Sequence, residues 1–252
     1  VSFAARSSPF YKKRLANYDR NSAFPLTGVP VLAPARLREL LPPVSHALVA
    51  GRETAYNVFQ SGGTTGSPKT TLFSHAELEQ LTLPNARGFF ACGLVPSDRV
   101  ANLFAVGGLY MTFLHINRML QQYGCMNFPF SNHTPPDFVA AVAKLFKINC
   151  VAGISSVVLS ALRNIDGAQP GSLKLKKIYY GGEHLYGSDK AELREKFGAK
   201  IILAPGYGTV DTWYLGYQCL QCPTGVFHAH DDQCCLEIVD EETGKHCGSG
   251  EA

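Results

Sequence analysis

Apolar residues between positions 99 and 204 switch repeatedly between two spacings. Short apolar runs predict buried strands, and the segments between them carry apolar residues at helical spacing. We expect strands at 99–105, 125–130, 149–153, 175–180 and 200–203. We expect helices at 110–122, 136–147, 155–164 and 188–197. Strands that alternate with helices of about 10–15 residues predict an α/β fold, with mostly parallel sheets flanked by helices.

The pattern before residue 99 is less regular. Helices are expected at 11–18 and 33–41, and short strands at 55–59 and 70–73. Ser74 and Glu77 have the spacing of a capping box, so we expect a helix from there to about Cys92, with Leu78, Leu81 and Phe89 on its buried face. Near the carboxyl end, 237–244 reads as a strand running into a turn. We expect a core over residues 1–204 and a small β segment over 205–252.

Composition narrows the class of protein. Apolar residues make up 46% and charged residues 17%, which is typical of a globular domain. The sequence contains no uninterrupted apolar run of about 18 residues, so no membrane span is predicted. A net charge of +3 without a basic block argues against nucleic acid as a partner. Eight cysteines in an α/β chain favour thiols or a metal over disulfides, and we expect a cytoplasmic protein.

The segment from Ser61 to Lys69 (SGGTTGSPK) concentrates the chemistry of an anion site. Its glycines let the backbone approach a ligand closely, and successive N–H groups in such a loop form an anion-binding concavity. Hydroxyl groups and one lysine add donors that suit phosphate. The spacing is not that of a Walker A loop, which disfavours a P-loop phosphotransferase. A flexible surface linker is the alternative interpretation. The candidate binding residues are Ser61, Gly62, Gly63, Thr64, Thr65, Gly66 and Lys69.

Two further glycine-rich loops follow predicted strands. One is Gly181-Gly-Glu183, and the other runs from Pro205 to Asp211 (PGYGTVD). Ligands of open parallel sheets bind at the carboxyl ends of the strands, where both loops are expected. Each loop alone is more often a simple turn. Together with the first loop they predict a site for a nucleotide and a metal ion.

In this order, the three loops resemble those of the adenylate-forming superfamily of acyl-CoA synthetases and adenylation domains. The first resembles its phosphate loop, [ST]-[ST]-G-[ST]-[ST]-G-x-P-K, with Gly62 in place of the second hydroxyl residue. Gly181-Gly-Glu183 matches the G-[GA]-E turn. Tyr207 and Gly208 match the Y-G-x-[ST]-E motif, where Val210 and Asp211 replace the last two residues.

The resemblance implies roles for these residues. The phosphate loop would hold the phosphates of ATP, Gly182 and Glu183 would lie beside adenine, and Tyr207 would pack on that ring. Asp211 would help to hold Mg²⁺, less well than a glutamate because its side chain is shorter. Catalysis would rest on Lys69, Thr65 and Asp211. The full nucleotide-binding set adds Gly181, Gly208 and Thr209 to these residues.

Within the superfamily the chain is most similar to the phenylacetate–coenzyme A ligase branch. Ser8-Pro-Phe-Tyr11, the segment 29–38 and the segment 225–240 resemble elements of that branch. The implied reaction joins an aryl or related carboxylic acid to AMP and then to the thiol of coenzyme A or of an acyl carrier protein. A non-catalytic nucleotide-binding module is the alternative. The oligomeric state, a homodimer included, stays open.

The chain ends at Gly248-Ser-Gly-Glu-Ala252, where the superfamily would continue. The motif whose aspartate binds ribose and the mobile carboxyl-terminal domain are therefore expected outside this sequence. On that interpretation the segment alone would have little activity.

The acyl pocket of the superfamily falls on the segment from Asn102 to Tyr110. Phe104 and Tyr110, together with Gly206, are the candidate acid-binding residues. Aromatic residues at such spacing are more often part of a core.

Cysteine and histidine residues gather late in the chain. Cys219 and Cys222 form a C-x-x-C turn, which can present two thiolates to one tetrahedral ion. Strand alternation would add His228, and Cys234 is the best fourth ligand. We predict a structural zinc here. Reduced, partly buried thiols are the main alternative, and a redox pair is disfavoured because no thioredoxin-like context precedes it.

Overall fold

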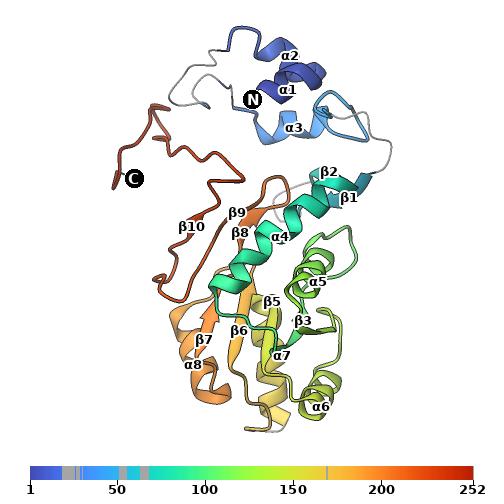
Figure 1. Ribbon diagram of the computed structural model, residues 1–252, viewed down its shortest axis with the longest axis vertical. Helices are drawn as coiled ribbons and strands as arrows, with labels where there is room; N and C mark the ends of the chain where they lie inside the picture. Colours follow the sequence, from blue (N-terminus) through green and yellow to red (C-terminus); the bar gives the residue numbers. More distant parts are fainter. Residues whose placement is uncertain are drawn as a thin grey trace.

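The fold is built around a five-stranded parallel sheet (Figure 1). The computed structural model describes residues 1–18, 26, 29, 31–50, 56–62, 68–168 and 170–251. The strand order is β4-β3-β5-β6-β7, and each neighbouring pair is parallel. The strands are β3 (Arg99–Leu103), β4 (Met126–Pro129), β5 (Cys150–Ile154), β6 (Lys177–Gly181) and β7 (Ile201–Leu203). The predicted α/β fold is confirmed.

Helices cover both faces of this sheet, because successive strand residues point to opposite sides. Ala101, Val151 and Ile178 pack against one helical layer, whereas Val100 and Tyr179 pack against the other. Strands that are buried on both faces are mostly apolar, which explains the short apolar runs in the sequence. The first layer consists of α6 (Pro136–Phe146), α7 (Ser155–Ala168) and α8 (Gly187–Phe197). The second consists of α4 (His75–Ala91) and α5 (Thr112–Tyr123).

An antiparallel hairpin precedes α4. Strands β1 (Tyr56–Gln60) and β2 (Thr70–Ser74) pair with each other, so the glycine-rich segment connects two paired strands. The capping box forms as predicted. The Glu77 backbone N–H donates to Ser74 Oγ at 3.2 Å, and the Ser74 N–H donates to Glu77 Oε2 at 2.7 Å. Since Ser74 ends β2 and caps α4, the hairpin is fixed to the helix without a loop.

The amino-terminal helices lie together at one end of the molecule, away from the parallel sheet (Figure 1). They are α1 (Ser2–Ser7), α2 (Pro9–Arg14) and α3 (Pro34–Leu40). The helix predicted at 11–18 instead begins at Pro9, because Ser8 Oγ accepts the Tyr11 N–H at 3.3 Å and caps it. No helix in the described part of the chain is both long and apolar enough to cross a membrane.

A small antiparallel sheet follows β7. Its order is β10-β9-β8, formed by β8 (Tyr207–Thr209), β9 (Trp213–Tyr217) and β10 (His228–Ala229). Strand β9 contacts α4, which places this sheet beside the second helical layer. The strand predicted at 237–244 is reduced to an isolated bridge between Val239 and His246. Here the sequence has strand-like alternation, but no partner strand in the described residues pairs with it along its length.

A buried ion pair joins the amino-terminal ends of β3 and β6. Lys177 Nζ donates to an Asp98 carboxylate oxygen and, at 2.6 Å, to the Gly93 carbonyl. The other Asp98 oxygen accepts from Asn149 Nδ2 at 3.0 Å. Burial raises the pKa of Asp98, but hydrogen bonding and charge from Lys177 outweigh that effect and hold the pKa below its usual value. All of these groups lie at the edge of the sheet opposite the strand carboxyl ends.

We predict that Asp98→Ala lowers the free energy of unfolding by about 3–5 kcal/mol, because it leaves the Lys177 charge buried without a partner. Urea titration measures this, with the exposed Glu241→Ala as a control that changes stability by less than about 0.5 kcal/mol. The double variant Asp98→Leu with Lys177→Met should recover most of the loss. Equal losses in the single and double variants would contradict the buried-charge explanation.

Candidate nucleotide site

A cavity of about 360 Å³ opens at the carboxyl ends of β6 and β7. Because these strands are parallel and adjacent, the loops that follow them meet at one edge of the sheet. The cavity is lined by aromatic side chains, by several glycines and by the turn that contains Glu183. Its lining residues are Tyr180, Gly181, Gly182, Glu183, His184, Ala204, Gly206, Tyr207, Gly208, Gly225 and Phe227.

The turn after β6 is fixed from two sides. Gly182 has φ +77°, a left-handed conformation that favours glycine at this position. Glu183 Oε2 accepts the Ser156 N–H at 3.0 Å, and the Glu183 carbonyl accepts from Ser155 Oγ at 2.8 Å. The carboxylate of Glu183 is thus anchored at the start of α7, where the positive end of the helix dipole favours a negative charge. The backbone of this turn is left to line the cavity.

The loop after β7 is held by close packing on α4. A Cβ on Gly88 would lie 1.8 Å from the carbonyl oxygen of Pro205, so only glycine permits this approach. Tyr207 lies two residues after Pro205. It is 60% exposed, and its ring centroid lies 5.3 Å from that of Phe227. An exposed ring at the mouth of a cavity can pack on a planar ligand.

The hairpin β1–β2 meets the same loop through one ion pair. Lys69 Nζ contacts Asp211 Oδ2, and Thr71 Oγ1 donates to Asp211 Oδ1 at 2.8 Å. Both charged side chains remain 26% exposed, so a ligand can reach them. This pairing joins segments 142 residues apart and brings the first predicted loop to the third. Lys69 and Asp211 neutralise each other in this arrangement.

The base of the phosphate-loop candidate is closed by backbone pairing. The Ser61 N–H donates to the Lys69 carbonyl at 3.0 Å, and the Lys69 N–H donates to Ser61 Oγ at 3.0 Å. The Gln60 N–H donates to the Leu109 carbonyl at 3.0 Å and ties the hairpin to the segment before α5. Gly63, Thr64, Thr65 and Gly66, which the sequence also assigned to this site, lie outside the described residues.

The chain matches the model of the AMP-binding enzyme family over residues 13–252. The chain belongs to this family. A comparison with curated protein sequences gave no significant match.

Solved structures show the same fold. A 2-hydroxyisobutyryl-CoA ligase in complex with 2-HIB-AMP and CoA superposes with TM-score 0.72 at 21% identity, over 85% of this chain and 48% of that structure. ATP-bound MatB from Rhodopseudomonas palustris gives TM-score 0.56 at 19% identity, over 81% and 40%. CmiS6 gives TM-score 0.54 at 20% identity, over 76% and 45%. The chain therefore spans about half or less of these structures, and the predicted adenylate-forming fold is confirmed.

The candidate acid-binding residues of this AMP-binding family member lie in different surroundings. Phe104 is 3% exposed and packs 3.7 Å from the position of a Cβ on Gly181, so it supports the cavity floor from within the core. Tyr110 is 43% exposed, and its hydroxyl lies 4.0 Å from the position of a Cβ on Gly62. Gly206 lines the cavity. Of the three residues, only Tyr110 and Gly206 are therefore accessible to a ligand.

The predicted metal ligands are brought together in part. Ligand atoms of Cys219, Cys222 and His228 lie within 4.8 Å of one another. Cys234 is not in this group. Its Sγ instead donates to the His230 carbonyl at 3.2 Å. The reason is local: Cys234 follows a turn after His230 rather than continuing β10, so strand alternation does not extend to it.

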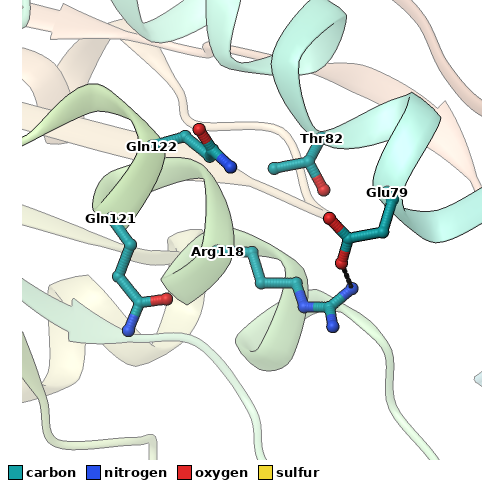
Figure 2. Close-up of a pocket in the computed structure, with 5 residues that line it drawn as sticks. All are labelled: Glu79, Thr82, Arg118, Gln121 and Gln122. Atoms are coloured by element: carbon teal, nitrogen blue, oxygen red, sulfur yellow. Dashed lines mark ion pairs between the residues drawn. The ribbon is translucent and has the colours of Figure 1, made fainter. Parts of the chain in front are cut away.

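A second cavity, of about 430 Å³, lies between α4 and α5 (Figure 2). Thr82 lines it, together with Gln121, Gln122 and the ion pair between Arg118 Nη1 and Glu79 Oε1 at 3.0 Å. None of the sequence-predicted site residues lines this cavity. The sequence-predicted residues that line a cavity are therefore those at the edge of the sheet.

Sequence reasoning missed several cavity residues. Three of them lie at or just after the end of a strand: Tyr180 and His184 at β6, and Ala204 at β7. Their position at the end of an apolar run was the available signal in the sequence. Gly225 and Phe227 come from a segment that is remote in sequence and enters the cavity only through the small sheet. Thr71 lies inside β2, and nothing in the sequence indicated its hydrogen bond to Asp211.

We predict that Gly88→Ala destabilises the protein by about 1–3 kcal/mol, because the new methyl group must displace the Pro205 backbone. The matched control is Gly167→Ala in α7, where a Cβ meets nothing within 4 Å. There the better helix propensity of alanine should raise stability by up to about 1 kcal/mol. Urea titration of both variants tests this. A stabilising Gly88→Ala would contradict the packing of α4 on the loop.

His115 supports the same region from α5. It is 2% exposed, and its ring centroid lies 4.1 Å from the ring of Trp213, two residues after Asp211. Burial, with a smaller effect of the Arg118 charge, lowers the pKa of His115 to about 3. The unfolded chain takes up a proton at His115 near pH 6.5, whereas the folded chain does not.

The His115 contribution to stability should therefore be complete above about pH 6.5 and be lost as pH falls from there toward 3, by up to about 1.4 kcal/mol per pH unit. Unfolding free energies measured at intervals between pH 4.5 and 7.5, about the span in which His titrates, test this prediction. In His115→Leu the slope below pH 6.5 should be shallower than in the wild type. Identical slopes would show that His115 does not stay neutral in the fold.

Proposed function

We propose that this chain forms the nucleotide-binding core of an ATP-dependent, AMP-forming carboxylate–thiol ligase. The observation that carries the proposal is the meeting of three distant loops at one edge of the sheet. Two of them line the cavity, and the third reaches Asp211 through Lys69. Membership of the AMP-binding enzyme family supports the same conclusion.

The cavity is the proposed adenine end of the site. Its volume of about 360 Å³ falls within the range of about 300–1,000 Å³ that small-molecule pockets occupy. Gly181, Gly182 and Glu183 present backbone atoms to the edge of the base, while Tyr207 offers a ring to its face. Gly208 and Thr209 continue the strand of Tyr207 and would lie between the base and the phosphates.

Lys69 and Asp211 form the proposed phosphate end. A polyphosphate carries far more negative charge than one carboxylate, so it would draw Lys69 away from Asp211. Asp211 and Thr71 would then offer oxygen atoms of the kind that Mg²⁺ prefers, and Ser61 and the residues up to Lys69 would surround the phosphates. When bound, Mg²⁺ neutralises charge on the phosphates. In this arrangement Lys69, Thr65 and Asp211 are the proposed catalytic residues.

The proposed chemistry has two steps. A carboxylate oxygen attacks the α-phosphorus of ATP, the bond to the bridging oxygen breaks, and acyl-AMP and pyrophosphate result. A thiol then attacks the acyl carbon and loses its proton, while AMP leaves. Positioning and charge neutralisation by fixed groups supply most of the rate in such transfers.

An aryl or related acid is the proposed substrate, and coenzyme A or a carrier-protein thiol the proposed acceptor. The likeness to the phenylacetate–coenzyme A ligase branch supports the aryl acid. The exposed ring of Tyr110 beside Gly62 also supports it, because that ring offers an aromatic contact near the phosphate-loop candidate. Complexes of similar folds with an acyl-adenylate and CoA support the acceptor.

The test is carboxylate-dependent exchange of labelled pyrophosphate into ATP by the full-length protein, over a panel of aryl and short hydroxy acids. We expect exchange with at least one acid, and a loss of about 10²–10³-fold in Lys69→Ala, the size of effect of removing one preorganised charge donor. Lys174→Ala is the matched control. That exposed lysine precedes β6 at the opposite edge of the sheet and should leave exchange unchanged.

The alternative function gives a different result. ATP binding without exchange for any acid would favour a non-catalytic nucleotide-binding module, in which Val210 and Asp211 replace the usual residues of the motif. Equal exchange in the wild type and Lys69→Ala would show that the ion pair is not part of the phosphate site.

A further inference from the structure

The small sheet brings two thiols and one imidazole to a single point. Cys222 Sγ lies 3.5 Å from Cys219 Sγ, and His228 Nε2 lies 3.2 Å from Cys219 Sγ. Tetrahedral zinc with Zn–S bonds of about 2.3 Å and Zn–N bonds of about 2.0–2.1 Å separates its ligand atoms by roughly 3.5–3.8 Å. These two distances are thus within a few tenths of an ångström of the spacing that a zinc ion requires, and all three ligand atoms lie within 4.8 Å of one another.

Backbone geometry holds the ligands in this position. The C-x-x-C turn is closed by the Cys222 N–H, which donates to the Cys219 carbonyl at 3.1 Å. Two more N–H groups point at the sulfur atoms: Gln221 N donates to Cys219 Sγ at 3.4 Å, and Cys219 N donates to Cys222 Sγ at 3.3 Å. N–H donors directed at a thiolate stabilise its negative charge, as metal coordination requires.

The imidazole comes from the neighbouring strand. His228 of β10 pairs with Tyr217 of β9, and the C-x-x-C turn begins two residues beyond Tyr217. The pairing therefore sets the distance between the histidine and the turn. Cys219 and Cys222 are half-buried and His228 is exposed, so an ion can enter from solvent.

We propose that Cys219, Cys222 and His228 bind one zinc ion that joins the end of β9 to β10. Sulfur and imidazole ligands in a tetrahedral arrangement favour zinc over magnesium or calcium, and water completes the fourth position. Each thiol releases its proton to solvent when it coordinates. A disulfide between the two cysteines is the competing outcome, but it gives the adjacent imidazole no role.

The ion would also shape the candidate nucleotide site. Gly225 and Phe227 lie between Cys222 and His228 in the chain, and both line the cavity at the ends of β6 and β7. Zinc would close this short segment into a ring and restrict the positions of Phe227, whose ring lies 5.3 Å from that of Tyr207. This consequence rests on the proposed nucleotide function, whereas zinc binding itself does not.

Metal analysis of the full-length protein, purified with zinc present and then dialysed, tests the site directly. We expect about one zinc per chain in the wild type, and a loss of most of it in Cys222→Ser. The control is Cys235→Ser, an exposed thiol outside the group, which should keep its zinc. Replacement by Co²⁺ should give the strong visible bands of tetrahedral cobalt and a thiolate charge-transfer band, without recourse to a variant.

Less than about 0.2 zinc per chain in the wild type would overturn the proposal, since a folded structural site retains its ion. A thiol titration of the metal-free protein that finds two thiols fewer than expected would also overturn it, because that result indicates the disulfide. A cobalt spectrum without thiolate bands would overturn it as well. If Cys222→Ser does not fold, the wild-type zinc content and the cobalt spectrum still decide.

Calorimetry of AMP binding distinguishes two claims: that zinc binds at these three ligands, and that the bound zinc shapes the cavity. Removal of zinc by a chelator should weaken AMP binding by about tenfold if the ring through Phe227 preorganises the cavity. Full zinc with unchanged AMP affinity would overturn the link to the cavity but leave the metal site intact. Full zinc with no AMP binding at all would count against the proposed function instead.

Discussion

Parallel pairing of β6 with β7 is the constraint on which the candidate site depends. Parallel neighbours end at the same edge of a sheet, so the turn at Gly181 and the loop at Pro205 must meet wherever the chain goes between them. The buried pair of Asp98 and Lys177 fixes the opposite end of β6. One end of β6 is thus held by a buried ion pair and the other by its parallel pairing with β7.

The remaining parts of the site contact this edge of the sheet through an ion pair, a hydrogen bond and close backbone packing. Lys69 and Thr71 of the hairpin both contact Asp211, and Gly88 lets α4 approach the Pro205 backbone. The small sheet adds Phe227 from a third direction. The proposed phosphate end therefore depends on one half-buried ion pair, whereas the proposed adenine end is built on the parallel sheet.

The proposed zinc ligands are separate from the loops that form the candidate nucleotide site. Residues 13–252 match the AMP-binding enzyme family, and the fold recurs in a 2-hydroxyisobutyryl-CoA ligase at 21% identity. The group formed by Cys219, Cys222 and His228 lies outside the three glycine-rich loops at 61–69, 181–183 and 205–211. It lies at the end of β9 and on β10, next to Phe227, which lines the candidate cavity. A metal there would stabilise a wall of the cavity without taking part in the chemistry.

Much of this protein could be predicted from local sequence. The capping box of Ser74 and Glu77, the apolar strands of the sheet and the glycine loops after β6 and β7 are local patterns, because hydrogen bonding and burial over a few residues determine them. Contacts between distant segments were decided only by tertiary structure. Phe104 is buried behind Gly181, Cys234 is outside the group formed by Cys219, Cys222 and His228, and Val239 has a single bridge where a strand was expected. In each case periodicity in the sequence shows which residues share a face, but only the packed fold determines what that face meets.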